Sequence, residues 1–185
     1  MNASTLWGPF DMQAAARLTH IPRGTIDAWE RAGLVRASVK KGRGRGHARA
    51  WSLGDILQLR LAAELRDKGL PIRTIRRLLR MSQQQGWWQT STMPKVEAAP
   101  CSCAAAPIAV ITGRRWETVT MKSAAEVAAE VVSAIEPVLS FNLERLREQW
   151  LVELRPVVAE LFVEALGLRG EAAREKAREL TMQQP

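Results

Sequence analysis

The chain has 185 residues and a net charge of +8, with 46% hydrophobic and 25% charged residues. This length is enough for one domain, or for a small domain with an oligomerisation element. The longest apolar stretch, residues 104–111, is too short to span a bilayer, and the first ten residues lack the basic segment and apolar run of a signal peptide. We therefore expect a cytoplasmic protein with no membrane partner.

The positive charge lies in the N-terminal half of the chain. Residues 1–82 contain 16 Lys and Arg against 6 Asp and Glu, a net charge of +10. Residues 83–185 contain 11 Lys and Arg against 13 Asp and Glu, a net charge of −2. Because only one half is basic, that half is predicted to bind a polyanion.

Residues 11–34 have the pattern of a helix-turn-helix. Asp11 can cap a first helix over residues 12–19, because an Asp side chain accepts a hydrogen bond from the first helical turn. Residues 20–22 then supply the turn. A second helix follows and ends at Gly33, a residue type that favours the helix C-terminus.

A basic loop rich in glycine follows the second helix and forms a predicted wing. A short helix that can enter a major groove, beside a cationic loop that can lie along phosphates, is a DNA-binding arrangement. The alternative is a solvated basic loop that binds nothing, and the adjacent helix-turn-helix favours DNA. The candidate phosphate-binding residues of this loop are Lys40, Lys41, Arg43, Arg45, His47 and Arg49.

Two further helices are predicted after the wing. Ser52 can cap a third helix, with Asp55 three positions later in a short version of the capping box. This helix ends near Gly69, and Pro71 begins a fourth helix in its first turn. The arginines of the fourth helix can form a solvated face or contact DNA.

The next segment, residues 83–122, has the composition of a linker, with several prolines and the pair Trp87-Trp88. Two short runs of β-forming residues, 108–112 and 116–121, surround a glycine and predict a small β-hairpin.

A helical pattern begins at Ser123, which has the capping-box spacing with Glu126. From there to residue 166, apolar residues recur every three or four positions and form one seam. Pro137 and Pro156 are each expected to begin a new segment or to kink the helix. The predicted oligomerisation residues of the seam are Val131, Ile135, Leu139, Leu146, Trp150, Leu154 and Leu161.

The seam predicts a homo-oligomer, at least a dimer, because a helix does not leave such a stripe in water. The alternative is that the seam folds back on the N-terminal domain of its own chain. The predicted fold is therefore mainly α: a winged helix-turn-helix domain with a small β wing over residues 1–82, a linker over 83–122, and a helical oligomerisation region over 123–185.

Cys101 and Cys103 are the two cysteines of the chain, and a spacing of two residues is poor for a disulfide. Metal or redox sensing by this pair is an alternative, but two thiols need further ligands to hold a metal. We expect no metal site and no cofactor, and cysteines that are dispensable for DNA binding. No phosphate-binding loop, His/Glu metal motif or nucleophile–base pair is visible, so an enzyme is not predicted.

The N-terminal motifs together resemble the winged helix-turn-helix domain of the mercury-resistance (MerR) family of transcription regulators. The resemblance covers about 70 residues and fails beyond residue 82. The matching stretches are Ala14-Ala15-Ala16-Arg17-Leu18-Thr19, Thr25-Ile26, Trp29-Glu30-Arg31-Ala32-Gly33-Leu34, Arg49-Ala50-Trp51-Ser52, Asp55-Ile56, and Leu65-Arg66-Asp67-Lys68-Gly69-Leu70-Pro71-Ile72.

The resemblance implies that Arg23, Gly24, Thr25 and Asp27 lie in or near the major groove. It also implies that wing cations touch phosphates or a minor groove. Two residues depart from the family pattern, which often has Arg where this chain has Asp27 and an aromatic residue where it has Ala28. Because Asp27 repels phosphate, base recognition is expected to differ.

These observations predict a nucleoid-associated transcription regulator that binds a pseudo-palindromic operator in double-stranded DNA as a dimer. RNA polymerase or another protein remains open as a further partner. The alternative is an architectural, phage- or chromosome-associated DNA-organising protein with a coiled-coil tail.

Overall fold

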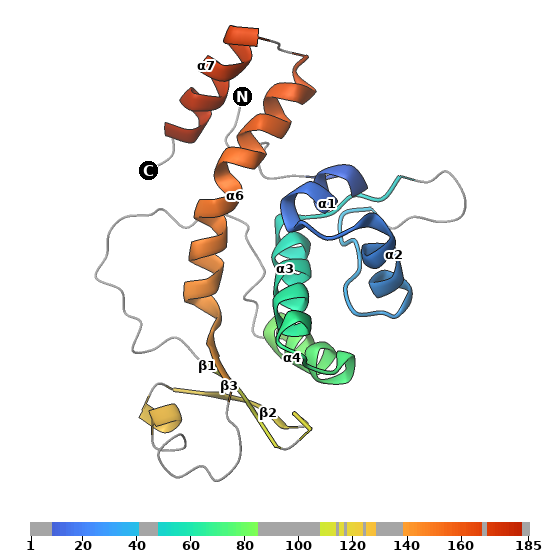
Figure 1. Cartoon of the computed structure of the whole chain (residues 1–185), viewed down its shortest axis with the longest axis vertical. Helices are drawn as coiled ribbons and strands as arrows, with labels where there is room; N and C mark the ends of the chain where they lie inside the picture. The colour runs from blue at the N-terminus through green and yellow to red at the C-terminus, as the bar shows by residue number, and fades with distance from the viewer. Residues whose placement is uncertain are drawn as a thin grey trace. The chain divides into compact units, whose positions relative to one another are not determined.

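The computed structural model describes residues 9–40, 48–84, 108–113, 115–116, 118–123, 125–128, 139–167 and 170–182. This part of the chain is mainly helical, with one three-stranded sheet (Figure 1). Its labelled elements are α1 (Met12–Thr19), α2 (Arg23–Arg31), α3 (Leu53–Asp67), α4 (Ile72–Gln84), β1 (Ile108–Thr112), β2 (Thr118–Lys122), β3 (Leu139–Asn142), α6 (Leu143–Ala165) and α7 (Gly170–Met182).

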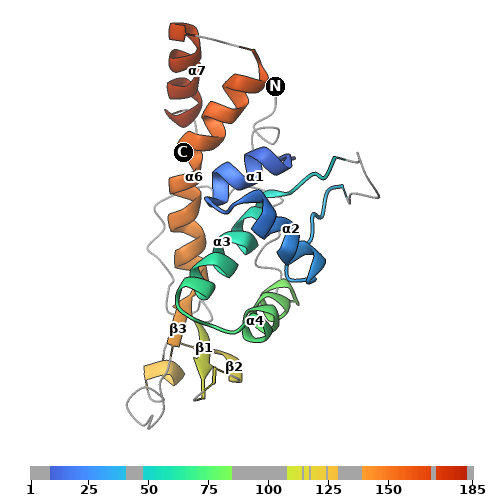
Figure 2. The same cartoon turned by 45° about the vertical axis from the view of Figure 1, so that its right-hand side comes forward.

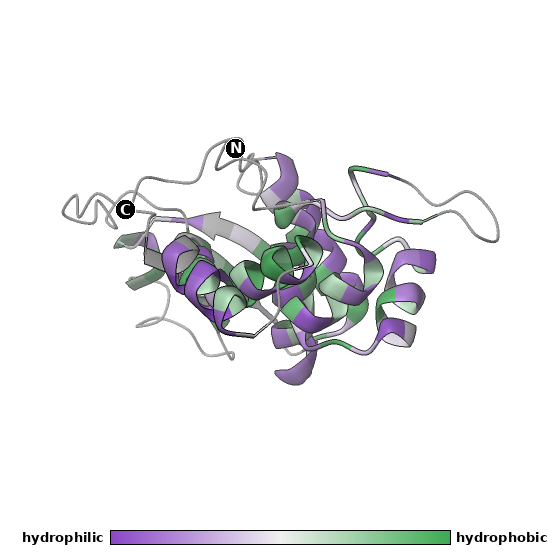
Figure 3. Cartoon of the chain, turned by 90° about the horizontal axis from the view of Figure 1, so that it is seen from above, coloured by the Kyte–Doolittle hydropathy of each residue, from purple (hydrophilic) through white to green (hydrophobic). Residues whose placement is uncertain are grey.

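The chain divides into two compact units, and the divisions fall inside α3 and α6. The first unit contains the described residues up to Arg60 and from Trp150 onward, and the second contains those from Leu61 to Gln149. The helices of both units contain a mixture of polar and apolar residues (Figure 3). None of the described helices is long and apolar enough to cross a membrane.

The predicted first helix is confirmed with its cap. The Oδ1 atom of Asp11 accepts a hydrogen bond from the Ala14 backbone N–H at 2.7 Å. At the other end, the Thr19 hydroxyl donates to the Ala15 carbonyl oxygen at 2.7 Å, and His20 adopts a left-handed conformation with φ 58°. This C-terminal cap directs the chain into the turn before α2.

The second helix ends as the sequence predicted. The Leu34 backbone N–H donates to the Trp29 carbonyl oxygen at 2.9 Å, and Gly33 has φ +66°, a conformation that favours glycine. On the inner side of α2, Ile26 is buried together with Leu18 from α1. The two helices lie side by side in both views (Figures 1 and 2).

A hydrogen-bond network around Asp55 begins α3. Asp55 is buried, with 4% of its surface exposed, and its Oδ2 atom accepts from the Ser52 backbone N–H at 2.9 Å. The Ser52 hydroxyl oxygen accepts in return from the Asp55 N–H at 3.2 Å, which confirms the capping box. The same Oδ2 atom accepts from the backbone N–H of Ser38 at 2.9 Å and from its hydroxyl at 2.8 Å. One carboxylate therefore holds the two chain segments that flank the wing.

The second unit contains α4 and the sheet. The buried side of α4 carries Ile75, Leu78 and Leu79. Strands β1 and β2 pair antiparallel, which confirms the predicted hairpin, although β2 begins at Thr118 rather than at residue 116. The Thr74 hydroxyl of α4 donates to the Trp116 carbonyl oxygen at 2.6 Å, so the turn of the hairpin is attached to the helix.

Strand β3 corrects the prediction of a continuous helical seam. Leu139 was assigned to that helix, but it lies in β3, which pairs antiparallel with β1 and completes the sheet order β2-β1-β3. Along β3, Leu139 and Phe141 alternate with the exposed Ser140, which is the period of a strand. Pairing with β3 satisfies backbone groups of β1 that a helix at this position would leave without partners.

The helical pattern is confirmed on either side of this strand. Residues 125–128 are helical, and two hydrogen bonds from Ser123 hold the pKa of the Glu126 carboxyl below its ordinary value. The Asn142 side chain accepts from the Arg145 N–H at 2.9 Å at the start of α6. Pro156 lies inside α6, so of the two predicted alternatives a new segment does not begin there, and a kink of the helix stays a prediction.

We expect Asp55→Ala to lower the free energy of unfolding by about 2–4 kcal/mol, because it leaves N–H groups of Ser38 and Ser52 without their acceptor. Urea unfolding followed by circular dichroism measures this effect. Asp67→Ala, which removes an exposed carboxylate from the same helix, is the control and should change stability by less than about 0.5 kcal/mol. An unchanged midpoint for Asp55→Ala would contradict the role of the network.

Candidate nucleic-acid interface

The outward side of α2 presents a face of polar and small residues. The face consists of Arg23, Gly24, Asp27, Ala28 and Arg31, whose spacing follows one side of a helix. Of these, Asp27 is half-buried and the others are exposed, whereas Ile26 points into the core. Thr25, also predicted to contact DNA, is half-buried beside this face. We call Arg23, Gly24, Asp27, Ala28 and Arg31 the exposed face of α2.

The N-terminus of α2 adds a favourable position for an anion. Its cap residue is Pro22, which makes no side-chain capping hydrogen bond, and the next two residues, Arg23 and Gly24, are exposed. The first N–H groups of a helix and its dipole attract negative charge. A phosphate at this end would therefore meet both the helix terminus and the Arg23 side chain.

The stem of the wing is an antiparallel pair of short extended segments. Lys40 and Ala50 exchange backbone hydrogen bonds of 3.2 and 3.1 Å. On the adjacent side, Phe10 and Trp51 exchange bonds of 2.9 and 2.8 Å. These contacts confirm that the chain turns back on itself between Lys40 and Ala50, and they place Lys40 at the stem. The predicted wing residues Lys41, Arg43, Arg45 and His47 lie outside the described residues.

Arg49 joins the wing stem to the exposed face of α2. Its Nη1 atom forms an ion pair with Oδ1 of Asp27, and its Nε atom lies 3.0 Å from Oε2 of Glu30. The sequence analysis placed Arg49 and Asp27 among the DNA-binding residues but did not pair them. The pairing could have been suggested only by the presence of two acids on a helix predicted to approach phosphates, since Asp27 and Arg49 are 22 residues apart.

The residues of the predicted oligomerisation seam differ in how deeply they are buried within the single chain. Trp150 and Leu154 are 5% and 2% exposed in the single chain, whereas Leu146 and Leu161 are half-buried. Val131 and Ile135 lie outside the described residues. For Trp150 and Leu154, the alternative in which the seam folds back on its own chain therefore accounts for their burial.

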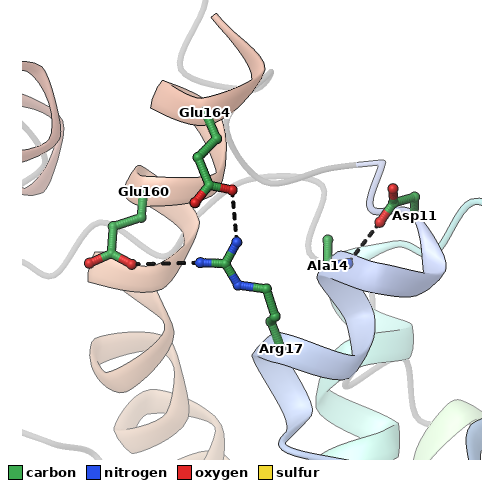
Figure 4. Close-up of polar contacts among 5 residues, drawn as sticks. All are labelled: Asp11, Ala14, Arg17, Glu160 and Glu164. Atoms are coloured by element: carbon green, nitrogen blue, oxygen red, sulfur yellow. Dashed lines mark hydrogen bonds and ion pairs between the residues drawn. The ribbon is translucent and has the colours of Figure 1, made fainter. Parts of the chain in front are cut away.

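Polar contacts accompany this burial within the first unit. The Arg60 guanidinium lies 5.5 Å from the centre of the Trp150 ring, and its Nη2 atom is 2.5 Å from Oε2 of Glu153. Arg17 of α1 forms ion pairs with Glu160 and Glu164 of α6 at 3.9 and 2.7 Å (Figure 4). These pairs connect the C-terminal part of α6 to α1 and α3.

The described residues contain no group of three or more His, Cys, Asp or Glu residues that could hold a metal ion. Cys101 and Cys103 lie outside the described residues, so the alternative of metal or redox sensing stays a hypothesis.

Comparison with known proteins identifies the N-terminal segment. Residues 10–82 match the family model of the MerR HTH family regulatory proteins, over the span that contains α1, α2, the wing stem and α3 and nearly all of α4. No curated protein sequence matches the chain. The match agrees with the resemblance found in the sequence and covers the +10 segment, whereas the rest of the chain lies outside it.

We expect Leu154→Ala to lower the free energy of unfolding by about 2–5 kcal/mol, because it opens a cavity at a buried site. If the burial comes from the chain itself, this loss is independent of protein concentration. Val152→Ala, at a position that is 62% exposed, is the matched control and should have little effect. A loss for Leu154→Ala that grows as the protein is concentrated would instead place the side chain between copies.

Proposed function

We propose that this chain, whose residues 10–82 belong to the MerR HTH family, is a sequence-specific transcription regulator that binds a pseudo-palindromic operator as a dimer. The observation that carries the proposal is the exposed face of α2 beside the stem of a cationic wing. This arrangement lies in the segment with a net charge of +10.

The proposed docking follows from the geometry of the two elements. A helix of the size of α2 fits the major groove of B-DNA, where base edges present distinct donors and acceptors. In this arrangement Arg23, Gly24 and Thr25 lie at the end of the helix nearest the phosphates. Lys40 and the predicted wing cations contact the phosphates of the neighbouring backbone. Phosphate contacts then set the register of the helix, and base contacts set the sequence preference.

The proposed dimer rests on two further arguments. One helix-turn-helix domain covers only a half-site, and a two-fold dimer lets two domains bind together. In addition, α6 retains apolar surface that its own chain leaves accessible, because Leu146 and Leu161 are only half-buried. Burying a Leu-sized side chain contributes roughly 1.5–3 kcal/mol, so a second copy of α6 is a favourable cover for this surface.

We expect DNA affinity to fall steeply with salt, because each neutralised phosphate releases counterions. The double variant Arg43→Ala with Arg45→Ala should weaken binding to every duplex and reduce the slope of log K against log salt by about 2. Fluorescence anisotropy from low to moderate salt measures both quantities. Arg174→Ala, an exposed arginine of α7 outside the proposed interface, is the control.

The same measurement, made against genomic and random duplexes with competitor DNA, tests the proposed function itself. Enrichment of a short palindrome near promoters supports a regulator. Many dispersed sites support the architectural alternative, and equal binding to all duplexes contradicts sequence specificity.

We expect sedimentation of the full chain to give at least a dimer, and Leu146→Asp to shift it toward the monomer because a charge then occupies the proposed interface. Operator affinity should fall at least tenfold, which corresponds to about 1.4 kcal/mol. Glu148→Asp, at an exposed position of the same helix, controls for the lower helix propensity of Asp. A wild-type chain that stays monomeric at concentrations saturating the operator would contradict the dimer.

A further inference from the structure

A carboxylate on the exposed face of α2 needs an explanation if that face approaches DNA. Asp27 lies in the middle of this face, and 41% of its side chain is exposed. A negative charge facing phosphates is repelled, and a solvated Asp at this position would weaken binding to every sequence. The chain nevertheless has Asp here, between Gly24 and Ala28.

Arg49 changes the charge that this face presents. Its guanidinium contacts Asp27 through Nη1 and Glu30 through Nε, so one cation holds two carboxylates that lie one helical turn apart. Glu30 is the more enclosed of the two acids, with 18% of its side chain exposed. A planar guanidinium held at two of its nitrogens has a fixed orientation, and it therefore restrains the Asp27 side chain as well.

The restrained carboxylate keeps acceptor capacity toward the groove. Among the residues that the structure describes, the partner of the Asp27 carboxylate is Arg49, which is bound through Oδ1, while Arg31 donates to the Asp27 backbone carbonyl. A carboxylate has two oxygens and about four acceptor sites, and it donates no hydrogen bond when ionised. The Asp27 carboxylate is thus a hydrogen-bond acceptor whose orientation is fixed and whose charge is partly neutralised by Arg49.

The small residues on either side allow this short side chain to reach a base. A Cβ atom added at Gly24 would meet nothing within 4 Å, so packing inside the chain does not require glycine there. Glycine in a helix destabilises it by roughly 0.5–1 kcal/mol relative to Ala, and its lack of a side chain permits close approach of another molecule. With Ala28 one turn further along, the centre of the face can approach the groove floor.

We propose that Asp27 accepts a hydrogen bond from the N4 amino group of a cytosine in the major groove, and that Arg49 is the residue that positions it. Cytosine presents a donor alone at this edge and adenine a donor beside the N7 acceptor, whereas guanine presents two acceptors and thymine an acceptor and a methyl group. A fixed carboxylate therefore favours cytosine, meets a repelling acceptor beside the donor of adenine, and disfavours guanine and thymine. This inference rests on the proposed function, because it names the base that the same interface recognises.

Selection from a pool of random duplexes by the full-length wild type and its variants tests the inference. We expect the wild-type consensus to contain a cytosine in each half-site, and Asp27→Ala to lose the preference at that position alone. Asp27→Asn should shift the preference toward adenine, since an amide pairs with adenine N6 and N7. Asp67→Ala, which makes the same change in net charge on an exposed part of α3, is the control and should keep the cytosine.

A double-mutant cycle, in which the affinities of the wild type and of Asp27→Ala are measured on the selected site and on a site with the base pair changed, gives the second readout. Replacing the cytosine pair by a thymine pair should weaken wild-type binding about tenfold or more and should leave Asp27→Ala unaffected. Arg49→Lys should lose part of the discrimination while keeping its charge, because one ammonium does not hold both acids in a fixed fork.

The outcomes separate the two claims. A wild type that selects no motif overturns the proposed function, and the inference falls with it. A wild type that selects a motif that Asp27→Ala retains at every position overturns the inference alone and leaves the pair with Arg49 a purely structural contact.

Discussion

The buried carboxylate of Asp55 is the contact on which the DNA-binding half of the molecule depends. It accepts hydrogen bonds from Ser38, before the wing, and from Ser52, after it, while it also caps α3. A buried carboxylate is costly unless several donors satisfy it, and here the donors come from the two segments whose separation defines the wing stem. The position of the stem is thus coupled to the start of α3.

A second electrostatic contact links the wing stem to α2. Arg49 follows the wing in sequence but is bound to Asp27 and Glu30 of the helix that precedes it. The net charge of +10 describes the segment as a whole and conceals this local arrangement, in which Arg49, a residue predicted to contact phosphate, pairs with two acids. In the proposed complex, affinity and specificity come from different residues: from wing cations for phosphates, and from the exposed face of α2 for bases.

The C-terminal half illustrates how one apolar pattern can serve two purposes. The stripe along α6 was interpreted as an interface between copies, yet Trp150 and Leu154 are buried within the chain itself, near ion pairs made by Arg17 and Arg60. The proposed dimer therefore rests on the half-buried part of the stripe. Apolar spacing along a helix predicts that a face is covered, but it does not identify the molecule that covers it.

The sequence by itself determined the elements whose signals are local. The Asp11 cap, the Ser52–Asp55 capping box and the Gly33 terminus each involve residues within five positions of one another, so backbone chemistry alone locates the ends of α1, α2 and α3. Only the tertiary structure decided that residues 139–142 form a strand and that Arg49 binds two acids of α2. These features join segments more than fifteen residues apart, and the partner of a segment over that distance is set by the fold and is not identified by any local spacing in the sequence.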